Sequence, residues 1–113
     1  MSTVLTVQQL DQKIYLILSQ LNWTLSHPKI VRWMGRCGFT AFQAMTFKAK
    51  HSLMRYLECA RDVRLQLKQM GLDEKYIETW AAARNYRDDC MVMKDWNQLR
   101  AELMKNWNDD ILF

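Results

Sequence analysis

The sequence predicts an all-α fold: a single domain spanning residues 1–113, with a small bundle of four to five helices around one long central helix at about residues 40–70. One proline, Pro28, and three glycines are the only strong helix breakers, and they fall between residues 28 and 38 and at residue 71. Apolar residues recur at steps of three and four along most of the chain, as on one face of a helix. Half of the residues are apolar and a quarter are charged, which is ordinary for a globular domain.

The first predicted helix begins at a capping box. Thr6 and Gln9 stand three residues apart, the spacing at which each side chain bonds the backbone N–H of the other residue. The helix must end before Pro28, because a proline ring disfavours helical geometry at the preceding residue. Its apolar stripe consists of Leu10, Ile14, Ile17, Leu18, Leu21 and Leu25.

A short second helix is expected to start at Pro28, because proline is well tolerated in the first turn of a helix. Gly35 and Gly38 bracket a tight connection after it. The long third helix is expected to open with a second capping box, formed by Thr40 and Gln43, and to end at Gly71. Its apolar stripe consists of Phe42, Met45, Ala49, Leu53, Tyr56, Ala60, Val63, Leu67 and Met70.

A fourth helix is expected from Asp73, a residue type that favours the N-cap position. The pattern weakens between residues 85 and 89, where either the helix kinks or Asp88 or Asp89 caps a fifth helix. Residues 108–113 read as a tail, and no internal repeat is evident. The fourth helix would bury Tyr76, Ile77, Trp80, Ala81 and Ala83, and the fifth Val92, Trp96, Leu99, Leu103 and Trp107.

The composition favours a cytoplasmic protein without a membrane segment. No apolar run approaches the ~20 residues that are needed to cross a bilayer. Residues 1–10 lack the basic and apolar regions of a secretory signal. The three cysteines are odd in number and widely spaced, which is typical of reduced thiols.

The sequence predicts no catalytic residues, no cofactor and no metal site. His27 and His51 lie far from each other and from any cysteine pair at metal-ligating spacing. Cys59 has no histidine close in sequence to serve as a base. Three scattered glycines cannot form a phosphate-binding loop. A non-enzymatic role is therefore expected.

The net charge of +4 is unevenly distributed. Residues 28–71 carry nine Lys and Arg against two acids, whereas residues 72–113 carry nine acids against six bases. On a helical projection of the third helix, four cations fall within a ~60° sector that contains no acid. Such a sector forgoes the stabilising pairs of opposite charge that helix surfaces usually contain, and it is typical of phosphate binding. The four cations are Lys50, Arg61, Arg64 and Lys68.

These patterns predict a module that binds nucleic acid, DNA or RNA, through the basic segment 29–71. The four cations would contact phosphates, while Phe47 and Gln43 would stack on or contact bases. Packing of Phe47 in a second layer of the bundle is the alternative for that residue. The predicted nucleic-acid-binding residues are Gln43, Phe47, Lys50, Arg61, Arg64 and Lys68.

Three further interpretations remain open at this stage. The helices before and after residues 35–38 fit a helix-turn-helix, whose groove-facing residues would be Thr40, Gln43, Thr46, Phe47 and Lys50. The same cations would also suit a protein-interaction module, such as an adaptor, inhibitor or immunity-type protein that binds an acidic partner. A helix of about 30 residues is longer than a small bundle needs, which favours a homodimer unless the chain covers this helix itself.

Overall fold

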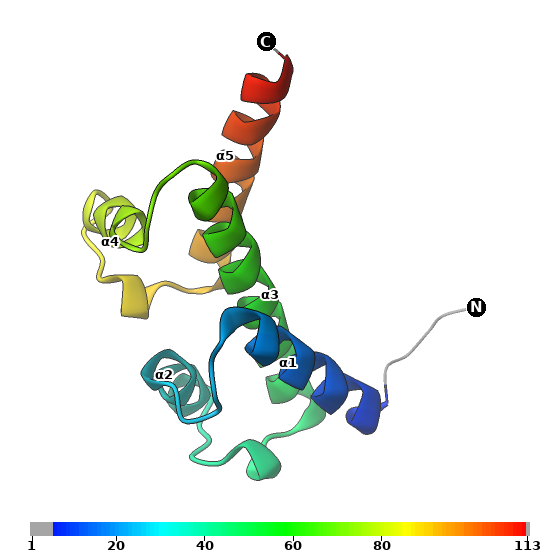
Figure 1. Ribbon diagram of the computed structural model, residues 1–113. Coiled ribbons are helices and arrows are strands. Elements are labelled where there is room, and N and C mark those ends of the chain that lie inside the picture. The colour runs from blue at the N-terminus through cyan, green and yellow to red at the C-terminus, as the bar shows by residue number, and fades with distance from the viewer. Residues whose placement is uncertain (1–5, 113) are drawn as a thin grey trace. The chain divides into compact units, whose positions relative to one another are not determined.

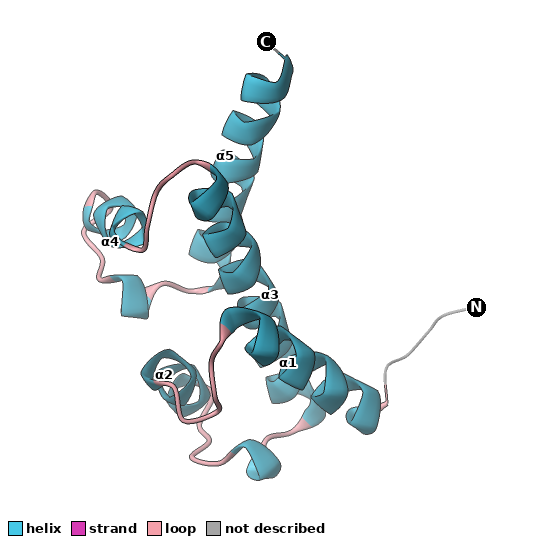
Figure 2. Ribbon diagram, in the orientation of Figure 1, coloured by secondary structure: helices cyan, strands magenta, loops and turns pink. Residues whose placement is uncertain are grey.

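The computed structural model describes residues 6–112, without the side chains of residue 89 and residues 106–112. Every regular element in this range is helical, which confirms the predicted fold class (Figure 2). Helix α3 is the predicted central helix, although it is shorter than the expected span of about residues 40–70. The elements are α1 (Val7–Leu21), α2 (Pro28–Arg36), η1 (Phe42–Ala44), α3 (Phe47–Gln69), α4 (Lys75–Ala82), η2 (Asp88–Cys90) and α5 (Met93–Leu112), where η denotes a 3-10 helix.

The chain divides into two compact units, residues 1–58 and residues 59–113. The boundary falls inside α3, so this helix contributes its first half to one unit and its second half to the other. The first unit also contains α1, α2 and η1, and the second unit contains α4, η2 and α5 (Figure 1). Each unit therefore has its own set of helices and its own buried side chains.

In the first unit, α1 begins at the predicted capping box, but it ends at Leu21, so the predicted stripe residue Leu25 lies in the following turn. The backbone N–H of Thr6 donates to Gln9 Oε1 at 2.9 Å, and the N–H of Gln9 donates to Thr6 Oγ1 at 3.1 Å. Asn22 follows the last turn in the left-handed region, with φ 63°. The face toward the core buries Leu10, Ile14, Ile17 and Leu18.

Helix α2 begins at Pro28, also as predicted, and it is held by one buried tryptophan. His27 is its N-cap residue, and His27 Nδ1 accepts a hydrogen bond from the N–H of Lys29 at 3.2 Å. The ring of Trp33 stacks on Tyr56 of α3, with ring centroids 4.3 Å apart and an interplanar angle of 7°. Because the two rings are nearly parallel and buried, they fix which face of α2 is turned to solvent.

The start of α3 differs from the prediction. Instead of a helix from Thr40, the chain forms η1 and then extended backbone at Met45, and α3 begins at Phe47. The N–H of Ala49 donates to Thr46 Oγ1 at 3.2 Å, so Thr46 caps the helix. Phe42 and Met45 are both buried in this arrangement, and their burial outweighs the local capping signal at residue 40.

In the second unit, the end of α3 and the start of α4 follow the predicted signals. Gly71 has φ 74° at the end of α3, as expected for a helix that stops at a glycine. Asp73 Oδ1 accepts from the N–H of Lys75 at 2.9 Å, and α4 starts at Lys75. Ile77, Trp80 and Ala81 are buried as predicted, whereas Ala83 is exposed after the helix has ended.

The predicted break before α5 is confirmed, but its cap is different. The N–H of Val92, the residue before α5, donates to Asp95 Oδ2 at 3.1 Å, whereas residues 88 and 89 lie earlier, in η2. Trp96, Leu99 and Leu103 are buried, and Val92 is 48% exposed. Helix α5 continues to Leu112, so the predicted tail at residues 108–113 is helical up to that residue. The side chain of Trp107 and residue 113 lie outside the described part of the chain.

The length of α3 no longer argues for a dimer, because the chain covers the helix itself. Its first half buries Leu53, Tyr56 and Leu57 in the first unit. Its second half buries Cys59, Val63 and other apolar side chains in the second unit. The structure thus supports the alternative in which one chain buries the apolar stripe as far as Leu67, while Met70 at its end is half-buried.

Replacing Thr46 with Ala is expected to lower the free energy of unfolding by about 1 kcal/mol, because it removes the side-chain cap of α3. Thr40→Ala is the matched control, since Thr40 is exposed and precedes η1. Denaturant unfolding of both variants measures the difference. Equal losses, or a larger loss for Thr40→Ala, would contradict the observed start of α3.

Candidate functional site

The structure buries Lys50, one of the predicted phosphate contacts. Its side chain is 8% exposed, and its Nζ lies 3.0 Å from Asp11 Oδ1 of α1. The same ammonium group lies 4.4 Å from the centroid of the Phe42 ring. The charge of this lysine is compensated inside the first unit, and its burial places it poorly for contact with a surface phosphate.

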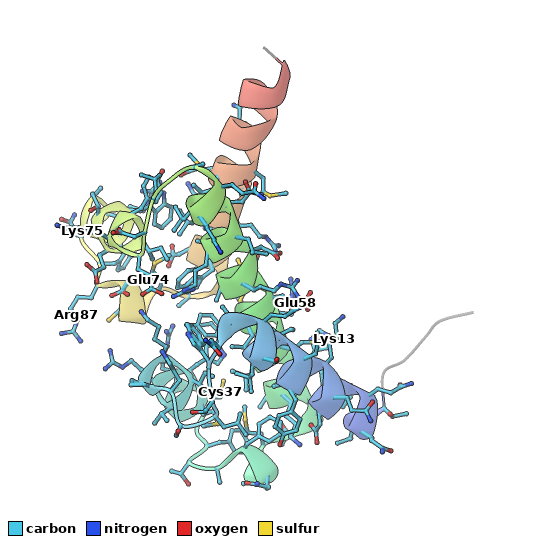
Figure 3. The ribbon with its side chains drawn as sticks, viewed as in Figure 1. Lys13, Cys37, Glu58, Glu74, Lys75 and Arg87 are labelled. Atoms are coloured by element: carbon cyan, nitrogen blue, oxygen red, sulfur yellow. The ribbon has the colours of Figure 1, made fainter. Side chains whose placement is uncertain are left out.

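Two more of the predicted cations are paired with acids. Arg64 Nε lies 2.7 Å from Glu74 Oε1, just before α4 (Figure 3), and its side chain is only 16% exposed. Arg61 Nε lies 3.2 Å from Asp62 Oδ1. The sector of α3 that holds these cations contains no acid, but acids outside the sector partly neutralise it. A projection of a single helix cannot show this, because Asp11 and Glu74 lie on other segments.

The other predicted residues are exposed but do not belong to one unit. Gln43 and Phe47 are exposed in the first unit, and Lys68 is exposed in the second unit. Phe47 is 40% exposed and lies near His51, with ring centroids 6.4 Å apart. The Phe47 ring is therefore partly covered by other side chains and partly exposed to solvent.

The helix-turn-helix interpretation is wrong. Residues 37–46 separate α2 from α3 and include η1, whereas the motif needs a turn of about three to four residues. Thr46 is the cap of α3, and Lys50 is buried, so two of the groove-facing candidates have structural roles.

The positive charge lies mainly in the first unit. Residues 1–58 carry seven Lys and Arg against two acids, and residues 59–113 carry nine against ten. One of the two acids in the first unit, Asp11, is already paired with the buried Lys50. The surface of the first unit therefore has a strong excess of cations.

Three of these cations share one face of α2. Lys29, Arg32 and Arg36 are three and four residues apart, which places them within a ~60° sector of the helix. Arg32 and Arg36 are exposed, Lys29 is half-buried, and α2 contains no acid. We call these three residues the α2 basic face. Sequence analysis counted them in the basic segment but missed their common face, although their spacing shows it.

Trp33 anchors this face to the core. The guanidinium of Arg36 lies 4.9 Å from the centroid of the Trp33 ring, within the range of a cation–π contact. The Trp33 ring also stacks on Tyr56 within the first unit. The first half of α3 adds two exposed cations to this unit, Lys48 and Arg55.

Cys59 and the metal-ligating residue types were the other candidates for chemistry in the sequence. The thiol of Cys59 is buried and donates to the carbonyl oxygen of Trp96 at 3.2 Å. Among the described residues, no three His, Cys, Asp or Glu side chains are grouped so that they could hold a metal ion. None of the helices in this part of the chain combines the length and the apolar character that a membrane crossing requires.

A shallow cavity of about 260 Å³ lies where α3 meets the start of α4. Its charged lining residues include Arg64 and Glu74, which already pair with each other at 2.7 Å. The cavity therefore offers little uncompensated charge to a ligand.

Comparison with protein-family models, curated proteins and solved structures finds no match to this chain. The assignment of a function therefore depends on the chemistry of the chain itself.

Because Lys50 is buried and paired with Asp11, Lys50→Met is expected to lower the free energy of unfolding by about 1–3 kcal/mol, since it leaves the carboxylate without its partner, and to leave binding of nucleic acid by the folded variant unchanged. Asp11→Asn keeps the lysine charge but removes its partner, and it should cost about 1–3 kcal/mol. Denaturant unfolding and a DNA titration of both variants test this. Loss of DNA binding in a stably folded Lys50→Met variant would show that Lys50 contacts phosphate.

Proposed function

We propose that this chain is a small non-enzymatic module that binds nucleic acid through the α2 basic face of its first unit. The observation that carries the proposal is a helix face with Lys29, Arg32 and Arg36 and no acid on the helix. A nucleic-acid backbone presents closely and regularly spaced negative charges, and Lys and Arg side chains at the surface are its usual partners.

The members of the face suit different contacts with the backbone. Arg32 and Arg36 are exposed, and each planar guanidinium can donate two parallel hydrogen bonds to one phosphate. Lys29 is half-buried at the start of the helix and supplies a compact charge. Lys48 and Arg55 of the same unit would extend the contact, and the exposed Gln43 and Phe47 would contact bases.

The rival proposal is a protein-interaction module, an adaptor, inhibitor or immunity-type protein, whose basic first unit binds an acidic surface of a partner. The near balance of charge in residues 59–113 favours it, because this unit adds little attraction for a polyanion. Under either proposal the protein is placed in the cytoplasm, and the three free thiols agree with that location. A homodimer is a separate proposal, which light scattering tests against the chain mass of 13.6 kDa.

The salt dependence of binding separates the two proposals. Each phosphate contact lowers the logarithm of the binding constant by ~0.9 per decade of salt, so three contacts weaken binding ~40-fold between about 50 and about 200 mM salt. Titration with short labelled duplex and single-stranded DNA and RNA measures this slope. Absence of binding to all four probes at low salt would contradict the nucleic-acid proposal and favour a protein partner.

Arg32→Gln with Arg36→Gln is expected to reduce the magnitude of the salt slope by ~1.8, because two phosphate contacts are removed. The control removes the same net charge from the second unit by Lys75→Gln with Lys94→Gln, at two exposed positions. It should leave the slope unchanged. Equal effects of the two double variants would show that net charge, and not the α2 basic face, governs binding.

A further inference from the structure

The two units contain the same succession of elements. The first unit has a long helix, a short helix, a 3-10 helix and a long helix, which are α1, α2, η1 and the first half of α3. The second unit repeats this order with the second half of α3, α4, η2 and α5 (Figure 1). Helix α3 thus closes one succession and opens the next.

The backbone turns of the two units agree in detail. After the short helix, Gly38 and Asn85 both have positive φ, at 88° and 64°. In both units the N–H of this residue bonds the carbonyl three residues back at 3.0 Å, and the next N–H bonds the carbonyl five residues back at 2.9 Å. The opening helices also end alike, with positive φ at Asn22 and Gly71.

Buried side chains recur at the same spacing. Ile30 and Trp33 of α2 correspond to Ile77 and Trp80 of α4, 47 residues later, and all four are buried. From the 3-10 helices onward the offset is 46 residues, because the segment between the residue with positive φ and the 3-10 helix is one residue shorter in the second unit. At that offset Met45, Leu53 and Leu57 match Met91, Leu99 and Leu103.

The exposure of the short helices follows the same register. Each residue from 28 to 38 has the same exposure class, buried, half-buried or exposed, as the residue 47 positions later. The sequence shows no evident repeat because the identities between the two copies are few and scattered. The structure corrects that expectation: the chain contains an internal repeat of one three-helix motif.

The charge of the α2 basic face is one difference between the two copies. At the positions of Lys29, Arg32 and Arg36, the second copy has Tyr76, Thr79 and Ala83. Tyr76 is half-buried like Lys29, and Thr79 and Ala83 are exposed like the two arginines. The second copy thus presents the same helix face without its charge.

We infer that the chain is two copies of one three-helix motif that overlap at α3, and that the side chains at residues 76, 79 and 83 occupy a second, uncharged equivalent of the nucleic-acid-binding face. This inference rests on the proposed function of the α2 basic face. Three cations in this register then determine whether a copy of the motif binds a phosphate backbone.

The test transfers the cations from α2 to α4. Tyr76→Lys with Thr79→Arg and Ala83→Arg is expected to create a second site, so that one chain binds two short DNA duplexes. The salt slope of the new site should be ~2.7, as for three phosphate contacts. The change at residue 76 could disturb packing, because Tyr76 is half-buried. The double variant Thr79→Arg with Ala83→Arg therefore changes only the two exposed positions, and the expected salt slope of its new site is ~1.8.

A matched control adds one lysine and two arginines to exposed positions of the second unit outside this register. Leu65→Lys with Gln69→Arg and Ala101→Arg serves this purpose, and it should not create a second site. The reverse transfer, Lys29→Tyr with Arg32→Thr and Arg36→Ala, should remove the site that the wild-type chain has. Circular dichroism confirms that each variant is folded before titration.

The outcomes separate this inference from the function on which it rests. A wild-type chain that binds no nucleic acid removes both. A wild-type chain that loses binding on reverse transfer, while neither α4 variant gains a second site, keeps the function and overturns the inference. A second site that also appears in the control overturns the inference, because position in the repeat would then not matter.

Discussion

One buried tryptophan on each short helix is the constraint on which the rest of each unit depends. Trp33 packs flat against Tyr56 in the first unit, and the Nε1–H of Trp80 donates to Glu102 Oε2 at 2.7 Å in the second. An arginine lies over each ring, Arg36 at 4.9 Å and Arg84 at 3.6 Å from the ring centroid. A large buried ring determines the rotation of a short helix about its axis, and therefore which residues reach solvent.

The two copies satisfy this constraint with different chemistry. Glu102 accepts from Trp80 and also lies 3.3 Å from a guanidinium nitrogen of Arg84, so that arginine is turned toward the unit. In the first unit Tyr56 takes the place of Glu102 and offers a ring instead of a carboxylate. The Nε1–H of Trp33 is accordingly buried without an acceptor in the described part of the chain. The position that carries a carboxylate in the second unit therefore carries an uncharged ring in the first.

Sequence reasoning succeeded where a signal is local. The capping box at Thr6, the start of α2 at Pro28 and the end of α3 at Gly71 all depend on residues within one turn of the element. It failed at the start of α3, because burial of Phe42 and Met45 competes with the capping signal at residue 40. Burial of side chains from distant segments is invisible in a short window of sequence.

The candidate site shows the same limit more sharply. A projection of α3 correctly groups its cations, but the acids that neutralise Lys50 and Arg64 come from segments 39 and 10 residues away. By contrast, the α2 basic face can be recognised from the spacing of its three residues within one short helix. The structure adds that Arg32 and Arg36 are exposed. The internal repeat required the structure, since the shared features are turns and buried positions more than residue identities.

The most direct test of the account is to map the bound surface on the whole chain. Nitrogen-15 chemical shifts, recorded as a short DNA duplex is added to the labelled protein, locate the contact residue by residue. The account predicts that the largest shifts occur at residues 28–38 and at residues 48 and 55, while the repeat-related residues 75–85 stay unchanged. Shifts confined to residues 59–113, or shifts of equal size in the two short helices, would contradict it.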